Sequence, residues 1–390
     1  MNILILGDAN SVFVKDFCAH VLDKEGNNIC ILSYTNTGRF TELYTEMGVK
    51  EIYINPYIEA APPLHYTNIF QVMLQIKKEI KQVLPFDAPA DVIHVHYVEP
   101  TTLMYIFLVW LAAKKRILTF WGSDILRVEE ANRKILRPFL YMASAIVFMI
   151  PKQHEFFCDL YGDRFDKKTH IIDFGNSLLD LIDEVRQKYS RMECKKNFGR
   201  GASADKITIH VGYNKDEEQQ HMKILESICL LPSCLIEKIQ IIFPWGYGSS
   251  LHEDTYIKKI KVLLDGKGID YIFVKDFLQG EKLAGFRMSC DIFIYGQTTD
   301  AMSDSVLEYL YAGSLFLCPN WLRGNYSLID KYTAQVMHYI QFTDLCGMLC
   351  EIVSNKECVF TNQIESELRE TIYKNKSWEN LSSKWRECYE

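Results

Sequence analysis

The sequence lacks several motifs that would assign it to a well-marked class of protein. The sequence predicts two parallel sheets, as described below. Neither has a G-x-G-x-x-G fingerprint after its first strand, which argues against a dinucleotide-dependent dehydrogenase. Its 12 cysteines form no C-x-x-C pair, and we find no short His/Cys grouping with the spacing of zinc ligands. We therefore expect reduced, buried cysteines and no bound metal ion.

Three other features are scarce, and each excludes a class of protein. The net charge is −7 at pH 7, so there is no basic excess and nucleic acid is not an expected partner. The longest apolar run, residues 103–113, is shorter than the roughly 20 residues of a membrane-spanning helix. Residues 1–7 enter a strand without the basic and apolar regions of a signal peptide. We expect a cytoplasmic protein.

Short apolar runs typical of buried strands alternate with amphipathic stretches typical of helices. Helices are predicted over residues 14–22, 69–84 and 103–115. Strands are predicted over residues 2–6, 28–33, 51–54, 92–95, 117–120 and 145–149, and then over 206–212, 239–243, 270–274, 291–295 and 315–318. Repeated alternation of this kind indicates parallel, doubly wound sheets.

The length and composition fit two domains. A chain of 390 residues with 48% hydrophobic residues is too long for one ordinary core. We predict an α/β protein with a Rossmann-like domain over residues 1–176, a polar linker over 177–205 and a second Rossmann-like domain over 206–376. An amphipathic helix over 377–390, which begins with a serine cap, is expected to pack back on the first domain.

Residues 290–318 are the most informative segment. They indicate a buried strand, a polar loop, a helix with acids near its start, a glycine and a second buried strand. Ligands of parallel sheets collect at the carboxyl ends of strands, where helix N-termini offer N–H groups to phosphate. Ser303 and Ser305 lie where such groups are expected, and Glu308 could accept hydrogen bonds from a ribose. Alternatively, Asp300 caps the helix and Glu308 is a surface acid.

This segment resembles the E-x7-E element of family-four GT-B glycosyltransferases, with Asp300 in place of the first glutamate. Three more motifs are W-G-S-D at residues 121–124, V-G-Y-N at 211–214 with His221 beyond it, and P-W-G-Y at 244–247. Together these motifs resemble the 4-acetamido-4,6-dideoxygalactose (Fuc4NAc) transferase family, which also has the GT-B fold. The resemblance implies two Rossmann-like domains that face each other across a cleft.

The resemblance further implies a nucleotide-diphosphate sugar as donor substrate, with no cofactor and no metal ion. The implied donor-binding residues are Gly212, Tyr213, Asn214, Gly246, Tyr247, Asp300, Ser303, Ser305 and Glu308. Tyr213 and Asn214 replace the Arg and Lys that usually hold the diphosphate in family four, and Trp121 replaces a histidine. The group that holds the diphosphate therefore stays open, and the candidates are Lys215, His221, Lys275 and Arg287, each of which could instead be a solvated charge.

A catalytic base is needed if the reaction inverts the anomeric configuration. Asp8, directly after the first strand, is the first candidate and Asp124 is the second, although Asp124 could instead cap the following helix. His94 and His96 alternate along one strand, and we expect them on opposite faces of the sheet, so that at most one reaches the cleft. His96 is the better candidate of the two, and a purely structural histidine is an equal alternative.

Basic residues occur at 114–116 and again over 127–137, beside apolar and aromatic residues. This pattern suits an anionic membrane surface or a lipid diphosphate, although an ordinary helix flanked by solvated charges would look the same. We predict transfer of a sugar from the donor to a hydroxyl of a bacterial surface glycan carried on a polyprenyl diphosphate, in peripheral contact with the inner face of the cell membrane. The alternatives are a non-hydrolysing sugar-nucleotide epimerase and a catalytically silent GT-B subunit that only binds.

Overall fold

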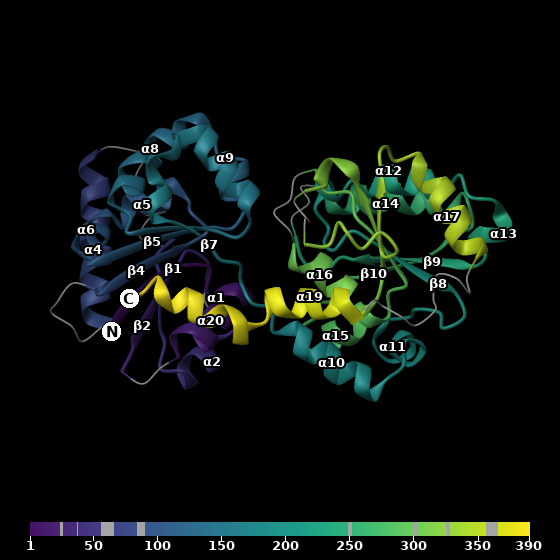
Figure 1. Ribbon diagram of the computed structural model, residues 1–390, viewed down its shortest axis with the longest axis horizontal. Coiled ribbons are helices and arrows are strands. Elements are labelled where there is room, and N and C mark those ends of the chain that lie inside the picture. Colours follow the sequence, from purple (N-terminus) through teal and green to yellow (C-terminus); the bar gives the residue numbers. More distant parts are fainter. Residues whose placement is uncertain are drawn as a thin grey trace. The chain divides into compact units, whose positions relative to one another are not determined.

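The computed structural model describes residues 1–23, 26–36, 38–55, 66–83, 90–248, 252–298, 303–324, 328–355 and 366–390. The chain divides into two compact units (Figure 1). Met1–Asn176 and Asn375–Glu390 form the first unit, and Ser177–Lys374 form the second. The polypeptide therefore leaves the first unit after Asn176 and returns to it after Lys374.

The described part of the first unit contains a seven-stranded parallel sheet with the order β3-β2-β1-β4-β5-β6-β7. Its strands are β1 (Asn2–Gly7), β2 (Asn28–Ser33), β3 (Lys50–Tyr53), β4 (Val92–His96), β5 (Lys115–Phe120), β6 (Ala145–Phe148) and β7 (Thr169–Ile171). Every residue of β4 and β6 is buried, as expected for strands that helices cover on both faces. The strand order reverses between β1 and β4.

Helices cover both faces of this sheet (Figure 1). One face is covered by α4 (Tyr66–Val83), α5 (Pro100–Tyr105), α6 (Phe107–Ala112), α8 (Glu130–Met142) and α9 (Pro151–Tyr161). The other face is covered by α1 (Val12–Phe17), the π-helical turn η1 (Cys18–Leu22), α2 (Thr41–Glu46) and α20 (Trp378–Glu387). Two short helices, α7 (Ser123–Leu126) and the 3-10 helix η2 (Asp163–Lys168), lie in loops after β5 and α9.

The C-terminal helix α20 is part of the core of the first unit. Its Trp385 is fully buried, with its ring centroid 5.0 Å from that of Phe17 and 5.2 Å from that of Phe174. The indole Nε1 of Trp385 donates a hydrogen bond of 2.9 Å to the carbonyl oxygen of Asp173. Residues from the two ends of the sequence therefore share one hydrophobic cluster.

Within the residues described above, the second unit contains a six-stranded parallel sheet with the order β10-β9-β8-β11-β12-β13. Its strands are β8 (Ile207–Val211), β9 (Ile239–Pro244), β10 (Asp270–Val274), β11 (Ile292–Ile294), β12 (Leu315–Pro319) and β13 (Val336–Tyr339). β8, β9, β11 and β12 are buried along their whole length. Here the order reverses between β8 and β11.

This sheet also has helices on both faces (Figure 1). One face carries α12 (His221–Ile228), α13 (Ser233–Ile236), α14 (Glu253–Asp265) and α17 (Asp344–Ser354). The other carries α10 (Leu178–Lys188), α11 (Arg191–Phe198), α15 (Gly280–Met288), α16 (Asp304–Ala312) and α19 (Ser366–Lys376). The 3-10 turns η3 (Glu217–Gln219) and η4 (Asn320–Leu322) follow β8 and β12.

The segment predicted as a linker, residues 177–205, is folded into the second unit. Its α10 buries Leu178, Ile182 and Val185 at helical spacing, and its α11 begins with a capping box between Ser190 and Glu193. Several charges that suggested a linker are exposed on these helices, namely Glu184, Lys188, Glu193 and Lys196. Lys195 is instead buried, and its Nζ pairs with the Asp291 carboxylate. The helix predicted over 103–115 is also divided, because its residues fall in α5, in α6 and at the start of β5. The Arg116 side chain hydrogen-bonds the carbonyl groups at the end of α6.

No helix in the described ranges is both long and apolar enough to cross a bilayer.

Candidate functional site

The candidate donor site lies in the second unit, at the carboxyl ends of β8, β9 and β11. Four segments meet there: residues 212–216 after β8, 245–248 after β9, 295–297 after β11, and the start of α16. The strand order reverses between β8 and β11, and crevices at such switch points bind ligands in open α/β sheets. The sequence motifs at 211–214 and 244–247 and the helix with Glu308 thus reach the same edge of one sheet.

The loop after β8 is held by a buried histidine. Gly212 has φ +66°, and a Cβ atom there would lie 2.8 Å from His221 Nε2, so only glycine fits. His221 Nε2 donates to the carbonyl oxygen of Asn214 at 3.1 Å, and Nδ1 lies 3.2 Å from the hydroxyl of Tyr256. Burial lowers the pKa of His221 to about 3, although the bond to the Asn214 carbonyl raises it. His221 is therefore neutral near pH 7, so it positions the loop and is not a cation for the diphosphate.

Three tyrosines from three strand ends stack in a row. The Tyr213 ring lies 5.8 Å from that of Tyr295 and 6.1 Å from that of Tyr247, with interplanar angles of 23° and 28°. Tyr247 is 39% exposed, so the row ends at the surface. The Gly246 backbone packs closely beside it, because a Cβ atom there would lie 2.2 Å from the carbonyl oxygen of Asp276. This row offers flat apolar faces to a ligand.

The first turns of α16 are built on a buried ion pair. Arg287 of α15 is 3% exposed and Glu308 is 8% exposed, and Nε donates to a carboxylate oxygen of Glu308 at 2.9 Å. A second guanidinium nitrogen donates to the hydroxyl of Ser305 at 3.1 Å. Burial lowers the pKa of Arg287, but Tyr309, Glu308 and Tyr247 outweigh it, so that its pKa lies above the ordinary value. Glu308 is therefore not a surface acid, which excludes that alternative.

The other predicted donor residues have mixed environments. Ser303 is the residue before α16, and the Ser305 hydroxyl lies 3.5 Å from that of Tyr247. Asn214 is buried and donates to the Asp216 carboxylate at 2.7 Å. Asp300, the first acid of the D-x7-E element, lies outside the described residues.

The side chains proposed to hold the diphosphate differ in their contacts and exposure. Lys215 Nζ is 2.7 Å from the Glu253 carboxylate, which also accepts a bond from the indole of Trp245. Lys275 is exposed directly after β10. Arg287 is the cation that contacts α16 itself. It reaches the helix start through Ser305.

Sequence reasoning missed two residues at this edge. Tyr295 is the last residue of the strand predicted over 291–295. Its position at a carboxyl end could therefore have predicted that it lies beside Tyr213. Gln219 had no such signal. It is fully buried beside Gly212, and its amide atoms have no hydrogen-bond partner within the described residues.

In the first unit, Asp8 lies where the sequence placed it, directly after β1. Its carboxylate accepts the N–H of Asn10 at 2.8 Å and the hydroxyl of Thr35. Burial, and then the carboxylates of Asp8 and Asp124, raise the pKa of Tyr34, whose hydroxyl donates to the carbonyl oxygen of His96. Asp8, Asp124 and Tyr34 are therefore close enough to interact at the carboxyl edge of the first sheet.

Asp124 has a structural environment. Its carboxylate accepts backbone N–H groups from Val98 at 2.8 Å, Trp121 at 3.0 Å and Gly122 at 2.8 Å. Burial raises the pKa of Asp124 to about 6, even though these hydrogen bonds lower it. The side chain thus fastens the W-G-S-D loop to the end of β4, and these three bonds go to residues before α7.

The prediction that His94 and His96 lie on opposite faces is wrong. Their ring centroids are 4.1 Å apart, because residues two apart on a strand share a face. His94 is bound by the hydroxyls of Tyr389 and Thr119. His96 is fully buried, its ring nitrogens have no hydrogen-bond partner among the described residues, and burial lowers its pKa to about 3.

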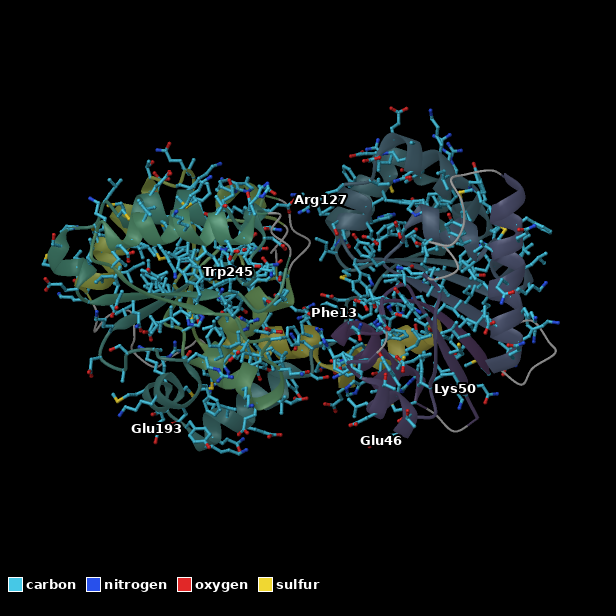
Figure 2. All side chains as sticks on the ribbon, turned by 180° about the vertical axis from the view of Figure 1, so that it is seen from behind. Phe13, Glu46, Lys50, Arg127, Glu193 and Trp245 are labelled. Atoms are coloured by element: carbon cyan, nitrogen blue, oxygen red, sulfur yellow. The ribbon has the colours of Figure 1, made fainter. Side chains whose placement is uncertain are left out.

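The aromatic cluster around this histidine also contains Trp121. The Trp121 ring lies 5.1 Å from that of Phe13, which Figure 2 labels on α1, and 6.1 Å from that of His96. His96 is therefore enclosed by rings, which favours the structural alternative over catalysis.

The basic residues at 114–116 do not form one patch with those at 127–137. Lys115 and Arg116 begin β5, whereas Arg127 follows its carboxyl end, and a strand of this length spans about 17 Å. Lys114 binds Asp91 and Lys115 binds the Tyr389 carbonyl, so these two lysines stabilise the fold. Arg127, Lys134 and Arg137 are exposed, and Figure 2 labels Arg127 at the surface.

The described residues contain one grouping that could hold a metal ion, formed by His154, Cys158 and Asp166 in the first unit. The sequence analysis overlooked it.

Residues 2–150 match the family model described as Glycosyl transferase 4-like. No curated protein matches the chain in sequence. Among solved structures, the chain is similar to HepE of Anabaena in complex with UDP and glucose, with a TM-score of 0.68 and 13% identity over 99% of this chain and 98% of that one.

Two further structures are similar over nearly the whole chain. A glycosyltransferase from Rickettsia africae has a TM-score of 0.73 and 15% identity, covering 100% of this chain and 97% of that one. Sucrose-phosphate synthase from Thermosynechococcus elongatus has a TM-score of 0.71 and 12% identity, covering 100% and 98%. The predicted pair of Rossmann-like domains is confirmed. With a glycosyl transferase 4-like region in its first unit and this fold throughout, the protein is a glycosyltransferase of the GT-B type.

Proposed function

We propose that the second unit binds a nucleoside diphosphate sugar at the carboxyl ends of β8, β9 and β11. One observation carries this proposal: the buried Arg287 is paired with Glu308 and bonded to Ser305 at the start of α16, beside the switch point of the sheet. A buried cation and a helix N-terminus together favour an anionic group at that position. The diphosphate is therefore assigned to the start of α16.

The rest of the donor is assigned to the neighbouring side chains. The carboxylate of Glu308 accepts hydrogen bonds from the ribose hydroxyls, and its bond to Arg287 fixes its orientation. Tyr247, at the exposed end of the row, offers a ring face to the base or the sugar, and Tyr213 packs behind it. The Gly212 loop allows close approach of the ligand to the backbone. In this arrangement Glu308 is the second acid of the D-x7-E element.

The similar structures suggest which nucleotide to test first. HepE of Anabaena was crystallised with UDP and with UDP-glucose, so UDP is the first candidate for this chain. The motifs that resemble those of the Fuc4NAc transferase family support a sugar-nucleotide donor as well, and they also support the proposed role in building a surface glycan.

For the acceptor we propose a hydroxyl of a bacterial surface glycan carried on a polyprenyl diphosphate. Exposed Arg127, Lys134 and Arg137 support contact with a lipid diphosphate or with anionic lipid at the inner face of the membrane. If the reaction inverts the anomeric carbon, Asp8 is the base. Asp124 is less suited, because three backbone N–H groups occupy its carboxylate.

The test is calorimetric titration of the full chain with UDP, GDP and dTDP, with CMP as control. We expect one diphosphate to bind, and to raise the melting temperature of the protein because a ligand of the folded state must do so. Ser305→Ala should weaken that binding by up to about tenfold, the value of one hydrogen bond. Ser233→Ala is the matched control, since Ser233 is exposed at the start of α13. Absence of binding by every diphosphate would refute the proposal.

A further inference from the structure

A mixed set of potential metal ligands lies between α9 and η2 of the first unit. His154 and Cys158 are four residues apart on α9, so their side chains share one face of the helix. The chain turns at Gly162, and η2 brings Asp166 back to that face. The sequence analysis found no such grouping because Asp166 joins it only through this turn.

The three ligand atoms have the separations of a tetrahedral zinc site. Cys158 Sγ lies 3.3 Å from His154 Nε2 and 3.7 Å from an Asp166 carboxylate oxygen, which lies 3.3 Å from the same Nε2. Zinc bonds of about 2.3 Å to sulfur and about 2.0–2.1 Å to nitrogen and oxygen predict ligand separations of about 3.6 Å and about 3.3 Å at tetrahedral angles. The observed distances agree to within about 0.3 Å.

A catalytic Cys-His-Asp relay does not fit the same atoms. In a relay the nucleophile and the carboxylate bind opposite nitrogens of the imidazole ring. Here the thiol and the carboxylate both approach Nε2. Three groups that converge on one point are arranged for a shared cation.

Charge and access also suit a cation. The carboxyl group of Asp163 interacts with the Cys158 thiol as well, so two acids surround the sulfur. The His154 side chain is 26% exposed and that of Asp166 is 52% exposed, which leaves a path for an ion from solvent. Thiolate and imidazole select zinc over magnesium or calcium, which prefer oxygen ligands.

We propose that His154 Nε2, Cys158 Sγ and the Asp166 carboxylate bind one Zn²⁺, with water in the fourth position. On binding, the Cys158 thiol loses its proton to solvent and its sulfur forms the bond to zinc, without any change of oxidation state. The ion ties η2 to α9 and so stabilises the connection between β6 and β7. This site is independent of the proposed donor site, which lies in the other unit.

The test uses the full chain, stripped with a chelator and dialysed. Titration with Zn²⁺ should show one tightly bound ion per chain, and titration with Mg²⁺ should show no tightly bound ion. Co²⁺ should give the visible spectrum of a tetrahedral site together with a thiolate charge-transfer band. Cys158→Ser and His154→Ala should weaken zinc binding at least about a hundredfold, since loss of an outer-shell partner alone costs about 10–100-fold.

Cys346→Ser is the matched control. Cys346 and Cys350 interact at the same four-residue spacing on α17, but within the described residues they are not part of a grouping of three potential metal ligands. This variant should keep the tightly bound Zn²⁺. The proposal is wrong if Cys346→Ser loses the tightly bound Zn²⁺ while Cys158→Ser retains it. It is also wrong if the wild-type chain binds no stoichiometric Zn²⁺.

A second measurement needs no variant, in case a substitution prevents folding. Alkylation by iodoacetamide, mapped by mass spectrometry, should be slowed by Zn²⁺ at Cys158 and unchanged at the exposed Cys234. Equal rates at Cys158 with and without Zn²⁺ would overturn the assignment.

Discussion

Replacing Glu308 by glutamine should lower both the stability of the second unit and its affinity for nucleotide. The Arg287 side chain is 4% exposed and that of Glu308 is 10% exposed, and the variant leaves the guanidinium charge buried without its counter-ion. Removing one partner of a buried ion pair costs about 3–5 kcal/mol. Glutamine keeps an oxygen that can accept the bond from Nε, so we expect the lower end, about 3 kcal/mol.

This cost should be visible in scanning calorimetry. In a unit of this size, each kcal/mol shifts the melting temperature by about 2–4 °C, so the transition of the second unit should fall by about 6–12 °C. Nucleotide binding, measured at a temperature where the variant is folded, should weaken by about 1.5–3 kcal/mol, the value of a hydrogen bond to a charged group. Glu351→Gln is the control, because Glu351 is exposed on α17.

A double variant separates the two effects. Exchanging Arg287 and Glu308 together for methionine removes both charges, and apolar replacement of a buried pair is often neutral or stabilising. We expect the melting temperature to recover while nucleotide affinity stays low. If affinity recovers as well, Glu308 does not contact the donor. If the single variant melts like the wild type, the ion pair has no measurable influence on the fold, and the reasoning above is wrong.

Three further outcomes are expected. Asp8→Asn should lower kcat by roughly a hundredfold if Asp8 is the general base, with donor affinity unchanged; retention of configuration in the product, read by NMR coupling constants, would remove that role. Burial raises the pKa of Asp124 from 3.8 to about 6, so the folded state holds this proton more tightly than the unfolded state. The stabilisation from protonated Asp124 is thus present below about pH 4 and lost as the pH rises through about 6. Asp124→Asn should therefore reduce the dependence of the unfolding free energy on pH, measured by urea melts at pH 4, 5 and 7. An unchanged pH dependence would exclude this assignment. Chelation of divalent metals should leave nucleotide affinity unchanged, since the metal-ligand grouping in the described residues belongs to the first unit; affinity that Mg²⁺ or Mn²⁺ restores would contradict this.

The sequence predicted the two sheets because their central strands are continuous apolar runs. β7 and β13 were missed, since they are edge strands in which half-buried and exposed residues interrupt the pattern. Parallel strands have all their carboxyl ends at one edge of the sheet, so the sequence alone could group Tyr213, Tyr247 and Ser305.

Pairings between helices were not predictable in the same way. Arg287 and Glu308 lie on different helices, and their ion pair depends on which faces α15 and α16 turn toward each other. Sequence spacing alone made Glu308 look like one acid among many. For His94 and His96 the information was present, because a separation of two residues already places both on one face.

The packing of α20 into the first unit has a consequence for synthesis. Domains generally fold as units while the chain emerges, with the N-terminal one first. Here Trp378 and Trp385, which fill the face of the sheet beside Phe17, leave the ribosome only after the whole of the second unit. Until then Phe17, Phe174 and His94 face water or another partner. The second unit is therefore the first that can complete its core. During that time the apolar face of the first sheet stays uncovered, and a chaperone could bind there.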